Sequence, residues 1–172
     1  YGSGETAVHA LRDVDLEVRA GEFLVLLGAS GSGKSTLLNI LGGLDRPSTG
    51  EVAFLDHRLT DAPDEELTRY RREHVGFVFQ FYNLIPSLTV RENVAVGGMF
   101  GHRSGGLPIR LALAKADETL DFVGLAPRAD APVTTLTVAD LKRLELARAL
   151  AMEPTLLLLD EVMAGLNPKE VE

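Results

Sequence analysis

A glycine-rich stretch between an apolar run and a helical pattern constrains this chain more than any other feature. Residues 28–36 read GASGSGKST, which matches the pattern G-x-x-x-x-G-K-S/T in full. The apolar run at 23–27 predicts a buried parallel strand, and the apolar spacing at 34–41 predicts a helix. A glycine turn between such a strand and helix directs backbone N–H groups inward at the positive end of the helix dipole. The stretch therefore predicts a cradle for an anion such as phosphate.

The side chains of this cradle have expected roles in binding a nucleoside triphosphate. Lys34 would reach the β- and γ-phosphates, and the Ser35 hydroxyl would ligate Mg²⁺. A chance glycine turn that ends in lysine and serine is the alternative, and the complete pattern in its strand–helix context disfavours it. The other candidate phosphate-binding residues are Gly28, Ser30, Gly31, Ser32, Gly33 and Thr36.

A second apolar run ends in two carboxylates. Residues 156–159 are all leucine, and Asp160 and Glu161 follow them. A buried strand that delivers an acid at its carboxyl end is typical of the way phosphate-loop ATPases hold Mg²⁺, so Asp160 is the expected metal residue. Glu161 could polarise the attacking water as general base. An ordinary strand before an acidic turn is the alternative, and the complete glycine loop upstream favours the functional interpretation.

Composition narrows the class of protein. The formal net charge of −8 argues against a nucleic-acid partner bound by phosphate neutralisation. There is no cysteine, which excludes disulfides and cysteine-ligated zinc and fits a reducing cytoplasm. No apolar stretch has the length of a membrane-spanning helix and no secretory signal pattern is present, so we expect any membrane role to come through a partner.

Hydropathy patterns predict an α/β fold with a mainly parallel core sheet, flanking helices and an antiparallel β portion near the amino terminus. Residues 1–85 would form the first part of the ATPase core, 86–150 a helical subdomain, and 151–172 a return to the core. Strands are expected at 14–18, 23–27, 51–55, 75–79 and 155–159, and helices at 34–41, 64–72 (capped by Asp61 or Asp64), 89–96, 109–123 and 140–151.

The order of these motifs resembles the nucleotide-binding subunit of ATP-binding cassette (ABC) transporters over essentially the whole chain. Gln80, after the strand at 75–79, matches the family's Q-loop glutamine, which approaches Mg²⁺. Tyr1 lies where the family has an aromatic residue that stacks on adenine. Thr137 lies in the family's signature loop, and residues 164–167 lie at its D-loop.

This resemblance implies a function and its participants. The protein would hydrolyse ATP, with Mg²⁺, to drive transport through transmembrane subunits, and Lys34, Gln80 and Glu161 would be catalytic. Its ATPase domains would form a homodimer or heterodimer at the cytoplasmic face of the inner or plasma membrane, with no nucleic acid. Up to about residue 90 the chain resembles lipoprotein-release and macrolide-export ATPases, and from about residue 92 those of branched-chain amino-acid importers. A recombinant origin therefore stays open, and the cargo is undefined.

The signature loop departs from the family's usual Leu-Ser-Gly-Gly-Gln. Thr137 replaces serine, Val138 and Ala139 replace both glycines, and Asp140 replaces glutamine. In the family this loop covers the γ-phosphate of the opposite subunit, and each added Cβ atom restricts that approach. A helix cap at Thr137 with Asp140 in the first turn accounts for the same residues. Both interpretations stay open.

Other functions also stay open from the sequence. The family's closing histidine is unmatched, because every histidine precedes the strand at 155–159, so we expect the sequence to be part of a longer chain. A nucleotide-binding module with little turnover, or a soluble ABC ATPase not linked to transport, are the alternatives. A GTPase is disfavoured because no Asn-Lys-x-Asp motif occurs. The histidines are His9, His57, His74 and His102.

Overall fold

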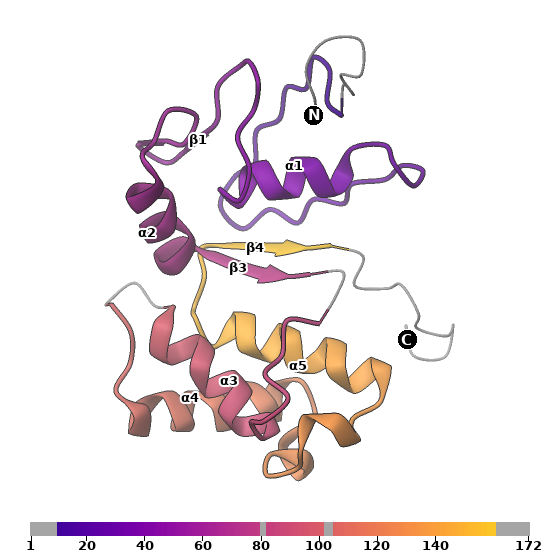
Figure 1. Cartoon of the computed structure of the whole chain (residues 1–172), viewed down its shortest axis with the longest axis vertical. Helices are drawn as coiled ribbons and strands as arrows, with labels where there is room; N and C mark the ends of the chain where they lie inside the picture. The colour runs from indigo at the N-terminus through magenta and orange to yellow at the C-terminus, as the bar shows by residue number, and fades with distance from the viewer. Residues whose placement is uncertain (1–9, 80–81, 102–104, 161–172) are drawn as a thin grey trace. The chain divides into compact units, whose positions relative to one another are not determined.

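The computed structural model describes residues 10–79, 82–101 and 105–160 (Figure 1). Contacts between Cα atoms divide the chain into two units, residues 1–60 and 61–172. Three expected site residues, Tyr1, Gln80 and Glu161, lie outside the described residues. The first unit contains α1 (Lys34–Leu41), β1 (Ala53–Phe54) and β2 (His57–Arg58). The second contains α2 (Asp64–His74), β3 (Val75–Val78), α3 (Val90–Phe100), α4 (Ile109–Phe122), the 3-10 helices η2 (Ala126–Arg128) and η3 (Val133–Thr135), α5 (Val138–Leu150) and β4 (Leu156–Leu159).

The first unit confirms the helix after the glycine loop and the antiparallel β portion. α1 covers the predicted range 34–41, and the N–H of the next residue, Gly42, bonds to the carbonyl of Leu38. β1 and β2 pair as a short antiparallel hairpin, with Ala53 opposite Arg58. The strand expected at 51–55 is thus shorter than predicted.

The strands predicted at 14–18 and 23–27 do not form, and these two predictions are wrong. The ladders that the structure describes join β1 to β2 and β3 to β4, and they include neither segment. Phe23 and Leu27 are 84% and 90% exposed, although an apolar run is typical of a buried strand. A strand exists only where a neighbour satisfies its backbone N–H and C=O groups, and apolar composition alone does not supply that neighbour.

In the second unit, α2 runs directly into β3. The helix begins after Pro63, which has no side-chain capping bond, so the prediction of Asp61 or Asp64 as the cap is wrong. Asp64 instead belongs to a first turn with three acidic residues, and this turn gains from the positive end of the helix dipole. β3 then pairs in parallel with β4, which confirms the strands predicted at 75–79 and 155–159, each one residue shorter than predicted, and agrees with the expected parallel sheet.

Helices α3, α4 and α5 pack against one another around the main apolar core of the second unit. On α4 the buried residues Ala112, Ala116 and Leu120 recur every four positions, which places them on one helix face. That spacing is why the sequence predicts this helix to within one residue. The fully buried members of the core that α3 and α5 supply are Val90, Val94, Leu144 and Ala147.

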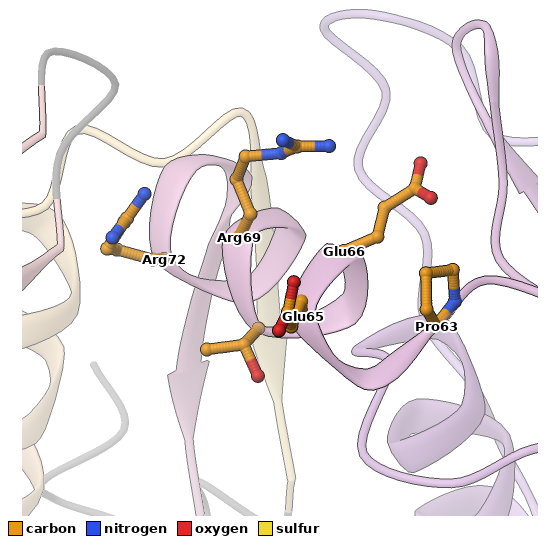
Figure 2. Close-up of a pocket in the computed structure, with 6 residues that line it drawn as sticks. Pro63, Glu65, Glu66, Arg69 and Arg72 are labelled. Atoms are coloured by element: carbon orange, nitrogen blue, oxygen red, sulfur yellow. The ribbon is translucent and has the colours of Figure 1, made fainter.

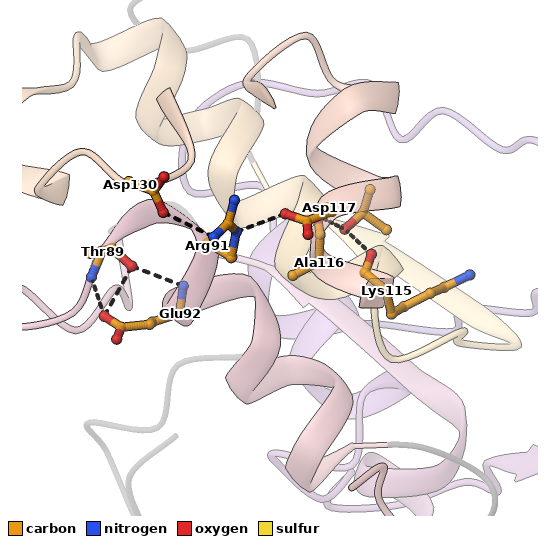
Figure 3. A network of polar contacts seen from close by, with 8 residues as sticks. Thr89, Arg91, Glu92, Lys115, Ala116, Asp117 and Asp130 are labelled. Atoms are coloured by element: carbon orange, nitrogen blue, oxygen red, sulfur yellow. Dashed lines mark hydrogen bonds and ion pairs between the residues drawn. The ribbon is translucent and has the colours of Figure 1, made fainter. Parts of the chain in front are cut away.

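Polar contacts fix the start of α3 (Figure 3). The Thr89 hydroxyl accepts from the Glu92 N–H at 3.2 Å, and the Glu92 carboxylate accepts from the Thr89 N–H at 2.8 Å, which makes a capping box. Arg91 bonds to Asp117 of α4 at 2.7 Å and pairs with Asp130 at 3.0 Å. The helix therefore starts one residue later than the sequence predicts, at Val90, and is held to α4. Among the residues that the structure describes, no helix has both the length and the apolar character needed to cross a membrane.

Candidate functional site

The glycine loop contains a turn and a left-handed glycine directly before α1. Ser32 N–H bonds to the carbonyl of Ala29 at 3.2 Å, which closes a turn inside the loop. Gly33 precedes the first helical residue of α1 with φ 94°, a left-handed conformation that favours glycine. A Cβ atom at Gly33 would lie 2.4 Å from the carbonyl oxygen of Ala10. The position therefore requires glycine both for its backbone angle and for its close approach to another part of the chain.

The ammonium of Lys34 lies over this loop. Its Nζ donates to the carbonyl oxygens of Gly28 and Ala29 at 2.7 and 2.8 Å, and approaches the Ser32 hydroxyl at 3.4 Å. The lysine charge is thus held beside the amino end of α1, where the helix dipole also favours anions. Ser35 and Thr36 follow in the first turn of that helix and are half-buried. The structure brings together all the candidate residues of the sequence pattern, Gly28, Ser30, Gly31, Ser32, Gly33, Lys34, Ser35 and Thr36.

A second group of candidate residues lies at the carboxyl ends of β3 and β4, in the second unit. Val78 pairs with Leu159, so the carboxyl ends of both parallel strands lie side by side (Figure 1). Asp160 follows β4, its N–H bonds to the carbonyl of Val78 at 2.9 Å, and it is 9% exposed. The expected metal residue is therefore a largely buried carboxylate beside the end of β3. Gln80 comes two residues after that end in the sequence.

Thr137 caps α5. Its hydroxyl accepts from the Asp140 N–H at 3.2 Å, which is the helix-cap interpretation of the altered signature loop. Val138 is 50% exposed at the first helical position. Contact of this loop with a nucleotide on an opposite subunit stays a prediction, since capping and such contact do not exclude each other.

Three buried charges on α5 escape the sequence analysis. Lys142 pairs with Glu145 at 3.2 Å, and Arg148 lies 3.9 Å from the same carboxylate. Burial lowers the pKa of Arg148, and the nearby Glu145 opposes that shift. The sequence shows charges of alternating sign at three-residue spacing, which usually indicates a solvated helix face. Here that face is packed against the chain segment that follows β3.

A hollow on the surface beside α2 contains none of the candidate site residues. It is lined by residues of both charge signs from α2 and from the residue before it (Figure 2). We assign it no part in nucleotide binding. Its lining residues are Pro63, Glu65, Glu66, Thr68, Arg69 and Arg72.

Comparison with known proteins agrees with this geometry. A family model described as "ABC transporter" matches residues 11–164. The lipoprotein-releasing system ATP-binding protein LolD of Bdellovibrio bacteriovorus is 42% identical over 97% of this chain and 74% of its own length. The pyoverdine export ATP-binding/permease protein PvdT of Pseudomonas fluorescens is 43% identical over 97% of this chain and 25% of its own length.

A solved structure matches the fold. The dimeric post-hydrolysis state of the ATP-binding cassette MJ0796, from Methanocaldococcus jannaschii, holds ADP and phosphate. It aligns with a TM-score of 0.89 at 40% identity, over 99% of this chain and 73% of that chain. The fold, the glycine loop and these matches confirm the resemblance read from the motifs. The chain belongs to the ABC transporter family, as an ATP-binding ATPase of that family.

Proposed function

We propose that this ATPase binds Mg²⁺ and ATP at the glycine loop and that two such domains hydrolyse ATP to drive a transmembrane partner. The observation that carries the proposal is the loop itself, whose turn, left-handed Gly33 and overlying Lys34 match a phosphate cradle. The dimeric relative that holds ADP and phosphate supports the same reaction for a pair of domains.

The loop residues fit the triphosphate chemically. Lys34 would transfer its hydrogen bonds from the neutral carbonyl oxygens of Gly28 and Ala29 to anionic phosphate oxygens, so that both donor and acceptor carry a charge. The N–H groups at the start of α1 would add partial positive charge. We further propose that Tyr1 stacks on adenine, as in the family.

The proposed magnesium residues are Ser35, Gln80 and Asp160. Hydroxyl, amide and carboxylate oxygens are the hard donors that Mg²⁺ takes in proteins. The buried carboxylate of Asp160 at the end of β4 supports the assignment. Bound Mg²⁺ would neutralise charge on the β- and γ-phosphates.

Hydrolysis itself would rest on Glu161. Its carboxylate would accept a proton from the water that attacks the γ-phosphorus, while Lys34 stabilises the charge on the departing ADP. Thr137 would approach the γ-phosphate of the opposite domain. Residues 1–85 and 151–172 would form the ATPase core and residues 86–150 the helical subdomain that faces the partner.

The named relatives bear on the direction of transport. Two of the named relatives, LolD and PvdT, belong by name to a releasing and an export system, which favours an exporter over an importer. We propose that the protein lies at the cytoplasmic face of the membrane, bound to transmembrane subunits, as the resemblance implies. The chain's own residues do not define the cargo.

Phosphate release from ATP, followed with and without Mg²⁺, tests the proposal. We expect chelation of Mg²⁺ to abolish release, and Glu161→Gln to lower the rate by on the order of 10² or more while ATP still binds. Glu118→Gln is the matched control, because this α4 carboxylate is largely exposed and pairs with Lys115. Hydrolysis by Glu161→Gln at the parent rate would refute the role of this residue.

A further inference from the structure

The buried charges of α5 form a row on one helix face. Lys142, Glu145 and Arg148 follow one another at three-residue spacing, which places them on the same side of the helix. Their side chains are 5%, 0% and 17% exposed. We call these three residues the charged row. The charged row contains two cations and one anion. The N–H donors of Lys142 and Arg148 outnumber the acceptors that Glu145 offers, so these cations also donate to groups outside the row.

The acceptors are backbone groups of the segment that follows β3. Lys142 Nζ donates to the carbonyl oxygen of Phe79 at 2.6 Å. Glu145 Oε1 accepts from the Asn83 N–H at 3.1 Å, and Arg148 Nη1 donates to the carbonyl of the same residue. Both backbone polar groups of Asn83 are therefore satisfied by α5 side chains, in the way that a neighbouring strand would satisfy them.

A buried side chain of α3 also binds the backbone of this segment. Asn93 of α3 is 1% exposed, and its Oδ1 accepts from the Ile85 N–H at 2.8 Å. Its Nδ2 donates to the Ile85 carbonyl at 3.0 Å. Residues 82–85, which we call the strap, thus have the backbone groups of alternate residues, Asn83 and Ile85, bound by side chains from two different helices. Lys142 also lies 4.7 Å from the centre of the Tyr82 ring.

Stability alone does not require charges at these positions. Removing charges from water costs free energy, and apolar residues of similar volume usually replace a buried ion network with no loss of stability. A carboxylate and a guanidinium do something that apolar groups cannot, since they fix one backbone residue through both its N–H and its C=O. The charged row therefore specifies where the strap lies against α5.

We propose that Lys142, Glu145 and Arg148 are positioning residues for ATP hydrolysis. They bind the backbone of Phe79 and Asn83 and belong to the helix that Thr137 caps, so they hold the strap against that helix. This inference rests on the proposed function, in which Gln80 and Thr137 act on the nucleotide. Nucleotide binding at Lys34 itself does not depend on the charged row.

A triple variant separates positioning from structural support. In K142M/E145L/R148M the row becomes apolar at similar volume, which preserves packing but removes every bond to Phe79 and Asn83. Because the backbone groups of Phe79 and Asn83 lose these partners, we expect a thermal midpoint somewhat below that of the parent, an unchanged Kd for ATP, and a kcat at least tenfold lower at a temperature where the variant is folded. A kcat within twofold of the parent, in a folded variant, would overturn the proposal.

Glu145→Gln serves if the triple variant does not fold. The amide keeps an acceptor for the Asn83 N–H but loses the charge that holds Lys142 and Arg148. A fall in kcat of severalfold with an unchanged Kd for ATP would support positioning, and a parent-like kcat would overturn it. K115M/E118L is the matched control, because it removes a more exposed ion pair of the same spacing from α4 and leaves the strap bonds in place. Its kcat should not change.

Amide hydrogen exchange without nucleotide distinguishes this inference from the proposed function. In the triple variant the Asn83 N–H should exchange at least tenfold faster, while the Ile85 N–H, which Asn93 binds, should keep its rate. Unchanged exchange at Asn83 would show that the row does not fix the strap. A parent protein that releases no phosphate from ATP would instead refute the proposed function, whatever the exchange rates are.

Discussion

At the scale of single residues, the glycine loop shows how one backbone angle limits the sequence. Gly33 has φ 94°, and a Cβ atom there would lie 2.4 Å from the Ala10 carbonyl. Gly21 has a similar φ of 76° with open space where a Cβ atom would lie. The two positions therefore share the cost of a left-handed residue, and only Gly33 adds a steric clash.

This difference yields a prediction. Gly33→Ala should lower the free energy of unfolding by clearly more than the roughly 1–2 kcal/mol of left-handed strain expected for Gly21→Ala. It should also weaken ATP binding, since the clash displaces the start of α1. Chemical denaturation and ATP titration of both variants give the two values. Equal losses at the two positions would show that the approach to Ala10 does not constrain the loop.

The residue scale also shows what a pattern cannot predict. The glycine loop was found from the sequence because its pattern specifies local backbone geometry. The charged row was missed because charges at the spacing of Lys142, Glu145 and Arg148 look the same on a solvated helix face and on a buried one. Only the hydrogen bonds from α5 to the backbone of Phe79 and Asn83 distinguish the two.

At the scale of elements, helices were predicted better than strands. The helices that start at Lys34 and Ile109 begin where the periodicity places them, because a helix forms its hydrogen bonds within its own segment. The strand predicted at 23–27 does not form, because a strand depends on a neighbour elsewhere in the chain. β3 and β4 pair in parallel, as expected of a mainly parallel sheet, and this pairing brings Asp160 to the end of β3.

The capping box of α3 gives a prediction for one element. Thr89→Ala removes the hydroxyl that accepts from the Glu92 N–H, so it should cost about 1 kcal/mol of stability. Thr134→Ala, at an exposed position in η3, is the control and should cost less than half as much. Urea denaturation measures both. Equal effects would mean that the box contributes nothing to the stability of α3.

The same capping box should give a pH dependence. The backbone and hydroxyl bonds from Thr89 lower the pKa of Glu92 in the folded state. A lowered pKa stabilises the folded state above the unfolded pKa of about 4.3, and this stabilisation is lost as the pH falls through the folded-state value. The stability difference between parent and Glu92→Gln should thus be largest near neutral pH and shrink below about pH 4. A difference that grows on acidification would contradict this sign.

At the scale of the whole molecule, each of the two units carries candidate residues of its own. The glycine loop belongs to residues 1–60, and Asp160, Thr137 and the charged row belong to residues 61–172. Family membership, the α/β fold and ATPase activity all followed from motifs and their order. Cargo and membrane partner did not, because transport specificity depends on surfaces that no motif in this sequence describes.

Direct titration of ATP into the parent protein and into Lys34→Ala tests the central claim, that the glycine loop is the nucleotide site. Lys34 supplies the charge over the loop, so its loss should raise the Kd for ATP at least tenfold, about 1.4 kcal/mol or more. Lys115→Ala removes a lysine that pairs with Glu118 and Glu153 in the second unit, and it should bind ATP like the parent. An unchanged Kd in Lys34→Ala would contradict the account.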